Sequence, residues 1–246
     1  MKAVHFHTTG DSSVLELEDD VPITKPKVNE VLILTEYAGV NSSTPTKASG
    51  LSPITLPEIA GREGADTIIE IGDEVAKLYG FKLPPCTSTS TGAAVLLQGL
   101  TAGTLAQNAH KVEKGQTVLI QAAAGGQGAH AVFSGIGNAT FATDLPTTLR
   151  KGTLASYGNS SGPVTACNIL DLSKKNVKLV RPTLANYISE PEEFKVRSEP
   201  LLSLVSGGEV KVPLGGEYEI ENLWRAQDDL AGQRSTGKLI VQVAQT

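Results

Sequence analysis

The sequence contains little cysteine, few aromatic residues and no excess of basic charge. Only two of its 246 residues are cysteines, Cys86 and Cys167, and aromatic residues make up 4%. Two cysteines this far apart do not form a disulfide framework, so we expect a reducing compartment and a cytoplasmic location. Asp and Glu number 26 against 21 Lys and Arg, which gives a net charge of −5 without any basic tract. This charge argues against a dedicated nucleic-acid binder.

Long apolar runs are absent as well. No stretch approaches the roughly 20 residues that a membrane-spanning helix needs, and the first ten residues, MKAVHFHTTG, lack the apolar core of a secretion signal. We therefore expect no membrane association. Hydrophobic residues make up 40% of the chain and charged residues 19%, which is typical of a globular protein with a buried core.

The first third of the chain is predicted to be rich in β-strands. Short apolar or alternating runs occur at residues 4–7, 14–17, 31–37 and 67–71, and glycine and proline separate them. Strands at this spacing indicate a small barrel or an irregular sandwich.

From about residue 84 the pattern changes to alternating helices and strands. Residues 92–110 predict a helix, and residues 117–122, 132–136, 152–157, 177–181 and 239–243 predict strands. A second helix is expected to begin at Pro191, to be kinked or divided at Pro200 and to end at residues 207–208. A third is expected to place Ile220, Leu223, Trp224 and Leu230 on one face. The predicted fold class is α/β with a β-rich part.

Two loops of small residues follow predicted strands. The first is AAAGGQG at residues 122–128, and the second is GNSSG at residues 158–162. Backbone N–H groups in such a loop, and at the start of a following helix, can hold the pyrophosphate of a dinucleotide. The alternatives are a tight strand-to-helix turn for the first loop, which departs from G-x-G-x-x-G, and an ordinary turn for the second.

Eight short segments, in this order, together resemble the zeta-crystallin-like quinone oxidoreductases of the medium-chain dehydrogenase/reductase superfamily. They are AGVN (38–41), GREG (61–64), QGLTA (98–102), AAAGGQG (122–128), KGTL (151–154), YGNSSG (157–162), RP (181–182) and STGKL (235–239). Each segment is weak alone, and their order and combination make the resemblance specific.

The resemblance implies a GroES-like substrate domain at residues 1–105 and 206–246, and a Rossmann-like domain at residues 106–205. It also implies NADPH as cofactor and a small-molecule quinone or enone as the acceptor of a hydride or an electron. A homodimer formed along the strand at residues 177–181 is expected from the same resemblance.

Several site residues follow from the resemblance alone. Asn41 and Thr101 would lie beside the nicotinamide, and Thr46 stands where relatives often have a tyrosine suspected of polarising the substrate. A threonine is a poorer proton donor than that tyrosine. The expected cofactor-binding residues are Ala123, Ala124, Gly125, Gly126, Gln127, Gly128, Gly158, Asn159, Ser160, Ser161, Pro182, Thr183 and Leu184.

No metal is expected. Zinc-dependent relatives have a cysteine near position 41 and a His-Glu pair in the segment at 61–64, where this chain has Asn41, Arg62 and Glu63. The four histidines show no ligand spacing with cysteines. His5 and His7 share one face of a strand and are interpreted as solvated or packed side chains.

The chain is shorter than the resemblance requires in two places. Relatives have another pair of strands after the segment that matches residues 72–75, and its loss would leave open sheet edges. The Rossmann-like domain lacks its second and third strands, because residues 132–136 resemble the fourth strand. Since a parallel crossover needs a dozen or more residues, we expect either that 117–122 and 132–136 are not parallel neighbours or that 132–136 is not a strand. The shortening leaves open a catalytically inactive relative that acts as a binding or structural protein.

Overall fold

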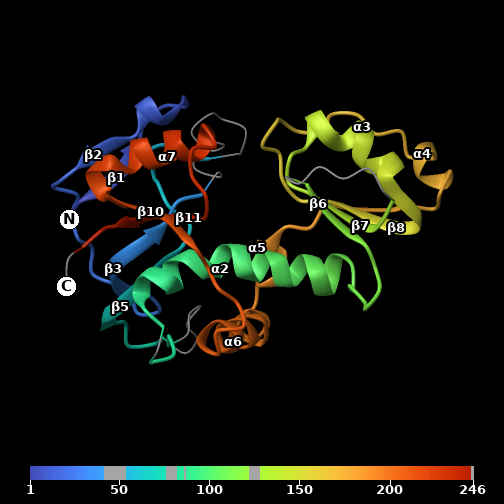
Figure 1. Ribbon diagram of the computed structural model, residues 1–246. Coiled ribbons are helices and arrows are strands. Elements are labelled where there is room, and N and C mark those ends of the chain that lie inside the picture. Colours follow the sequence, from blue (N-terminus) through green and yellow to red (C-terminus); the bar gives the residue numbers. More distant parts are fainter. Residues whose placement is uncertain (42–53, 76–81, 86, 122–127, 245–246) are drawn as a thin grey trace. The chain divides into compact units, whose positions relative to one another are not determined.

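The computed structural model describes residues 1–41, 54–75, 82–85, 87–121 and 128–244. The chain forms two compact units, which are drawn together in Figure 1. The terminal unit contains Met1–Gly99 and Phe194–Thr246, and the central unit contains Leu100–Glu193. The two boundaries between the units fall inside helices, one in α2 (Thr89–Thr104) and one in α6 (Pro191–Ser206).

The terminal unit contains two β-sheets. The smaller has the order β2-β1-β4, formed by Glu16–Glu18, Ala3–Phe6 and Glu58–Ile59, and all its pairings are antiparallel. The larger has the order β10-β11-β3-β5, formed by Leu214–Glu219, Lys238–Gln242, Val31–Gly39 and Gly64–Ile71. The glycine-containing strand β10, which the sequence pattern did not predict, pairs in parallel with β11.

Helix α7 (Leu223–Ala231) covers the core of the terminal unit, and the short helix η3 (Ile220–Asn222) leads into it. Its inward face carries Leu223, Ala226, Gln227 and Leu230, which follow the i, i+3, i+4, i+7 spacing of one helical face. Trp224 was expected on this face, but the prediction is wrong because its side chain is 47% exposed.

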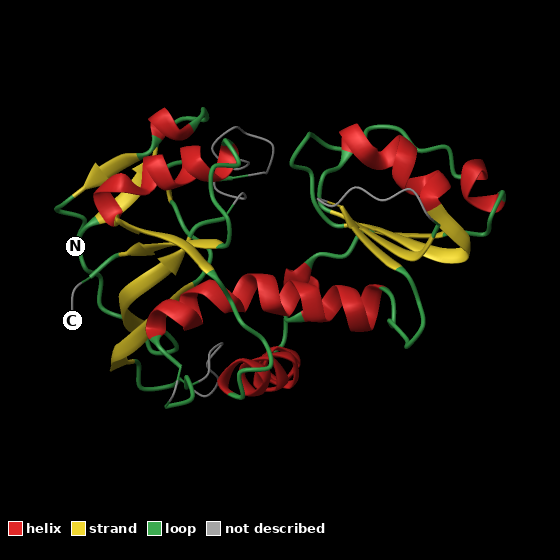
Figure 2. Ribbon diagram, in the orientation of Figure 1, coloured by secondary structure: helices red, strands yellow, loops and turns green. Residues whose placement is uncertain are grey.

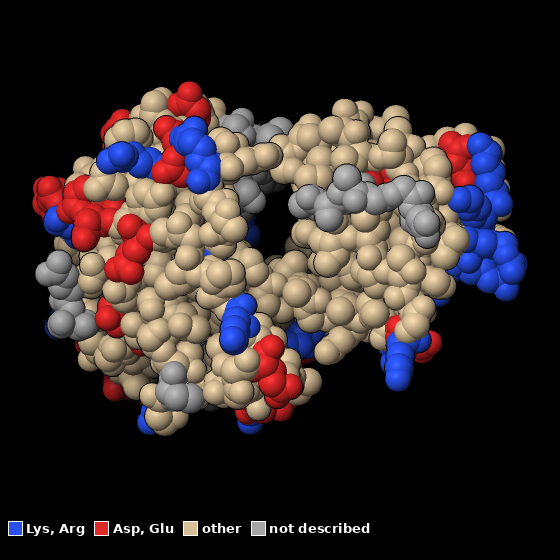
Figure 3. Space-filling view, in the orientation of Figure 1, with Lys and Arg blue, Asp and Glu red and all other residues tan. Residues whose placement is uncertain are grey.

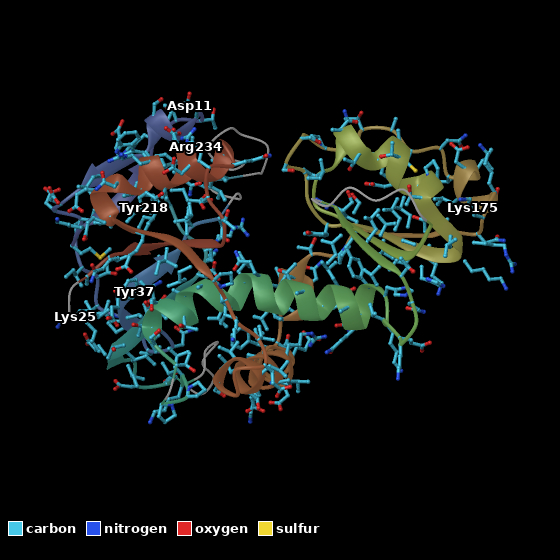
Figure 4. All side chains as sticks on the ribbon, in the orientation of Figure 1. Asp11, Lys25, Tyr37, Lys175, Tyr218 and Arg234 are labelled. Carbon is cyan, nitrogen blue, oxygen red and sulfur yellow. The ribbon has the colours of Figure 1, made fainter. Side chains whose placement is uncertain are left out.

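A carboxylate on α7 fixes the helix to its surroundings. Tyr218 of β10 donates a hydrogen bond of 2.7 Å to Asp229, and Arg234 donates one of 2.8 Å to the other carboxylate oxygen. Figure 4 labels Tyr218 and Arg234. Two donors in these positions hold the pKa of Asp229 below its usual range, with the bond from Arg234 contributing most.

Strand β5 is an open edge of the larger sheet among the described residues. Its isoleucines Ile68, Ile69 and Ile71 are 40%, 56% and 61% exposed. Residues of both faces are therefore open to solvent, as on other unpaired edge strands.

The central unit is built on a parallel sheet with the order β6-β7-β8-β9 (Figure 2). Its strands are Val118–Gln121, Ala129–Ser134, Thr148–Ser156 and Lys178–Val180, and each pairs in parallel with the next. In the Rossmann order 3-2-1-4-5-6, the first strand neighbours the fourth. Among the described residues, the observed sheet corresponds to the first, fourth, fifth and sixth strands of that order.

This pairing corrects one expectation. Residues 132–134 belong to a strand, and that strand is a parallel neighbour of β6, with Val118 opposite Ala131 and Gln121 opposite Ser134. Seven residues, 122–128, connect β6 to β7. A fully extended chain covers up to about 3.5 Å per residue, so seven residues are long enough to return along a strand of four residues.

Side chains on both faces of the central sheet are buried, as in other parallel sheets. On one face Val132 and Leu154 pack against Phe141 and Leu145 of α3 (Asn138–Thr147). On the other face Phe133 and Ala155 pack against Leu105 of the π-helical turn η2 (Leu105–Ala109). Asp144 is fully buried in α3, where it accepts a hydrogen bond of 2.9 Å from Thr140.

The remaining described helices are η1 (Ser12–Val14), α4 (Leu170–Ser173) and α5 (Leu184–Tyr187). Helix α6 begins at Pro191 as predicted, but Pro200 does not divide it. Pro200 and Val196 lie on the exposed side of the helix, so water can bond the Val196 carbonyl that lacks a donor from Pro200. None of the helices in the described part of the chain is long and apolar enough to cross a lipid bilayer.

Candidate functional site

Asn41 is the centre of a buried hydrogen-bond network in the terminal unit. It lies two residues beyond β3 and is 7% exposed. Its Nδ2 donates to the Glu63 carboxylate at 2.8 Å and to the Gly39 carbonyl at 3.2 Å. Its Oδ1 accepts from Gln98 at 2.6 Å and from Lys238 at 2.8 Å. These four bonds use the whole capacity of a side-chain amide, so Asn41 is fixed in one orientation.

Lys238 supplies the positive charge of this network. Its Nζ lies 2.7 Å from Glu63 Oε1, and it also donates to the Val40 carbonyl at 2.9 Å. Burial lowers the pKa of Lys238, and the Glu63 carboxylate opposes this effect. The second carboxylate oxygen of Glu63 accepts the backbone N–H of Leu97 in α2 at 2.7 Å, so this carboxylate joins β11, β3 and α2.

A second group of candidate residues lies at the carboxyl edge of the central sheet. Residues 122–128 follow β6, residues 158–161 follow β8 and residues 182–184 follow β9. The strands are parallel and in register, with Gln121 opposite Ser134 and Ser134 opposite Ser156. The segments therefore leave the sheet at the same edge, which is where open α/β sheets bind their ligands.

The loops after β7 and β8 pack directly on each other. A Cβ added to Gly158 would lie 2.3 Å from the Gly135 carbonyl oxygen, and one on Gly137 would lie 2.4 Å from that of Gly162. Gly137 also has a φ of 92°, which residues with side chains rarely adopt. This close backbone approach requires glycine, and the sequence reasoning did not assign residues 135–137 to the site.

Hydrogen bonds hold the second predicted loop in place. The backbone N–H and the hydroxyl of Ser161 both donate to the Ile136 carbonyl at 2.8 Å, and its hydroxyl accepts from Ala139 N–H at 3.0 Å. With its amide oriented to satisfy its neighbours, Asn159 accepts a bond of 3.1 Å from Arg181. Ser160 is exposed, and its N–H donates to the Gly135 carbonyl at 3.3 Å.

The other predicted residues are distributed between described and undescribed segments. Thr46 and Ala123 to Gln127 lie outside the described residues. Gly128 is exposed and directly precedes β7. Thr101 lies in α2, and Pro182, Thr183 and Leu184 lead into α5. The structure connects Asn41 with Glu63, Gln98 and Lys238. These three residues belong to segments that carried the resemblance but received no role.

A cavity of about 480 Å³ lies in the terminal unit and was not predicted. Apolar residues form most of its wall, and Glu63, Asp66 and Gln227 supply polar groups. Burial raises the pKa of Asp66, although Thr35 and the Glu36 N–H donate to its carboxylate. Oδ1 of Asp66 and Oε1 of Gln227 are buried without a partner among the described residues.

Comparison with known proteins identifies the family. A family profile described as zinc-binding dehydrogenase matches residues 106–241, more than half of the chain. The chain belongs to the zinc-binding dehydrogenase family. This agrees with the predicted membership of the medium-chain dehydrogenase/reductase superfamily.

Relatives of this family member cover its whole length. A quinone oxidoreductase from Pseudomonas aeruginosa is 26% identical over 98% of this chain and 99% of its own. A probable quinone oxidoreductase from Schizosaccharomyces pombe is 26% identical over 97% of this chain and 96% of its own. The first alignment has 325 positions and this chain has 246 residues, so at least 79 positions have no counterpart here. The family fold is therefore present in a shortened form.

Solved structures agree with this assignment. A mycobacterial protein in complex with NADPH has a TM-score of 0.92 at 25% identity and covers 99% of this chain and 100% of its own. A quinone oxidoreductase from Escherichia coli, also in complex with NADPH, has a TM-score of 0.92 at 23% identity, with the same coverage of both chains, and supports the fold.

The family description names zinc, but the residues of the Asn41 network do not fit this metal. It offers one carboxylate, an amide and backbone carbonyls, whereas zinc sites use Cys, His and carboxylate ligands. The Lys238 ammonium also bonds to the Asn41 and Glu63 oxygens that could face a cation. The network is therefore complete without a metal ion.

Proposed function

We propose that this chain reduces quinones or enone-type acceptors with NADPH, as an oxidoreductase of the zeta-crystallin type that uses no catalytic zinc. The observation that carries the proposal is the common carboxyl edge of β6, β8 and β9, from which the three predicted cofactor segments leave the sheet. The named activity of the Pseudomonas aeruginosa relative and the NADPH bound to the mycobacterial relative support it.

Backbone groups in the loops of the central unit would bind the cofactor. The loop at residues 158–161, whose orientation Ser161 fixes, would border the cofactor, and residues 182–184 would reach its carboxamide. Bound NADPH would supply the hydride and leave as NADP⁺, and the acceptor would take this hydride and a proton to become the hydroquinone or the saturated ketone.

Asn41 acts as a positioning residue in this proposal. Its four hydrogen bonds are all made within the terminal unit, and they hold the Asn41 side chain in place. Both amide N–H donors are used, so none is left for the substrate. Thr101 and Thr46 remain the candidates for contact with the reacting groups.

Fluorescence titration of the full chain with NADPH, followed by a benzoquinone-dependent NADPH oxidation assay, tests the function. We expect a dissociation constant in the micromolar range and turnover that requires both reactants. Absence of binding at millimolar NADPH would overturn the proposal and favour the inactive relative.

A bulky side chain at the exposed Ser160 tests the location of the site. We expect Ser160→Trp to weaken NADPH binding at least about tenfold, because the indole would occupy the edge where the cofactor is placed. Ser206→Trp, at the exposed end of α6, is the matched control and should bind NADPH as the wild type does. Equal binding by both variants would exclude this edge as the site.

A further inference from the structure

Three metal-binding side chains converge on the small sheet of the terminal unit. His5 of β1 and His7, the residue after β1, point to the same face because they are two positions apart. Glu18 belongs to β2, the antiparallel neighbour of β1. One ligand atom from each of the three side chains lies within 4.8 Å of the other two.

The distances between these atoms suit a small divalent ion. His5 Nδ1 lies 3.4 Å from one carboxylate oxygen of Glu18, and His7 Nε2 lies 3.1 Å from the other. Ligand bonds of about 2.0–2.2 Å in a tetrahedral zinc site separate the donor atoms by roughly 3.3–3.5 Å. The two separations between histidine and Glu18 are close to this value, and the two histidine nitrogens lie within 4.8 Å of each other, so side-chain rotations would be needed to bring three donor atoms around one ion.

Access and charge also favour a cation at this place. The side chains of His7 and Glu18 are 48% and 36% exposed, so an ion can enter from solvent and keep a water ligand. The segment from Glu16 to Asp20 contains four carboxylates. Figure 3 shows acidic side chains gathered over the end of the terminal unit that carries β1 and β2.

We propose that His5, His7 and Glu18 form a binding site for a divalent transition metal such as Zn²⁺. The three residues lie outside residues 106–241, so the zinc in the family description does not assign this site. A bound ion would add a link between β1 and β2, which pair as antiparallel strands.

The surroundings of His5 limit the affinity. Coordination through Nδ1 places the ring proton on Nε2, which is buried without a partner among the described residues. Metal-bound histidines usually donate this proton to an acceptor, and loss of such a partner weakens binding about 10- to 100-fold. We therefore expect a dissociation constant in the micromolar range.

Calorimetric titration of the full chain with ZnCl₂, after removal of any polyhistidine tag, tests the site. We expect one ion per chain, and at least about tenfold weaker binding for His7→Gln and for Glu18→Gln. Glu70→Gln is the control, because it removes an exposed carboxylate from β5, which belongs to the other sheet of the terminal unit. It should change the affinity less than about twofold.

Thermal unfolding separates a lost ligand from a damaged fold. Without metal, we expect the three variants and the wild type to have the same Tm, and Zn²⁺ should raise the Tm of the wild type and Glu70→Gln only. Co²⁺ should give a visible spectrum without a thiolate charge-transfer band, which excludes binding at a cysteine. No binding at millimolar Zn²⁺, or undiminished binding by His7→Gln, would overturn the proposal and leave an ion-pair cluster without a metal.

Discussion

The side chains of Lys238 and Glu63 form an ion pair in which Nζ and Oε1 lie 2.7 Å apart and only 8% and 4% of the side chains is exposed. The two residues are 175 positions apart and come from opposite ends of the chain. Asn41 bonds to both of them. The pair therefore connects β11, near the C-terminus, to the N-terminal strands of the terminal unit.

Removing one partner of this ion pair should be costly. We expect Lys238→Met to lower the free energy of unfolding by about 3–5 kcal/mol, because it leaves the buried Glu63 carboxylate without its cation. The double variant Lys238→Met/Glu63→Gln should cost less than the sum of the single changes. Urea unfolding at neutral pH measures both effects. Lys174→Met, which breaks an exposed pair with Asp171, is the control and should cost at most about 1 kcal/mol.

Asp66 should make the stability of the terminal unit depend on pH. Burial raises its pKa above the usual value of 3.8, so between 3.8 and the raised value the folded state holds more protons than the unfolded state. Its contribution to stability is therefore present below pH 3.8 and is lost as the pH rises through the raised value. We expect urea unfolding to show Asp66→Asn gaining stability relative to the wild type from pH 4 to pH 7. Glu70→Gln, an exposed change on the same strand, should show no such trend.

Two glycine-to-alanine changes should shift the free energy of unfolding in opposite directions. Gly158→Ala places a methyl group 2.3 Å from the Gly135 carbonyl oxygen, and we expect it to lower the free energy of unfolding by about 1–3 kcal/mol. Gly103→Ala places its methyl group in open space on α2. It should raise the free energy of unfolding by about 0.5–1 kcal/mol. Chemical denaturation distinguishes the two. A neutral Gly158→Ala would contradict the close packing of the loops after β7 and β8.

The free edge of β6 should promote self-association. Strand β6 pairs only with β7 among the described residues, and Ile120 on it is 57% exposed. Because an open apolar edge pairs with other chains, we expect Ile120→Lys to reduce aggregation. Light scattering during storage at room temperature measures this effect. Ile169→Lys, which changes an exposed residue outside any strand, should leave the aggregation rate unchanged.

Local patterns predicted most of the strands and helices. The run at 31–37 became β3, and the apolar run at 117–122 became β6, because their β-branched and apolar residues favour the extended backbone of a strand. The pattern missed β10, since Leu214–Glu219 is held by parallel pairing with β11 and not by apolar residues of its own.

The site was predicted less completely than the fold. Glycine and small residues after apolar strands indicated the loop at 158–162, and the resemblance selected Asn41. The partners Glu63, Gln98 and Lys238 were not assigned roles, because hydrogen bonds between residues 22 to 197 positions apart leave no periodic signal. The convergence of His5 and His7 with Glu18 was missed for the same reason.

The sequence alone determined the family and the class of fold, because these depend on ordered motifs. Only the tertiary structure decided that β6 and β7 are parallel neighbours, that Lys238 neutralises Glu63 beside Asn41, and that Gln227 faces the core while Trp224 is exposed. Each of these depends on which strands pair and which faces become buried, and such contacts are set by the free energy of the whole chain and not by its local segments.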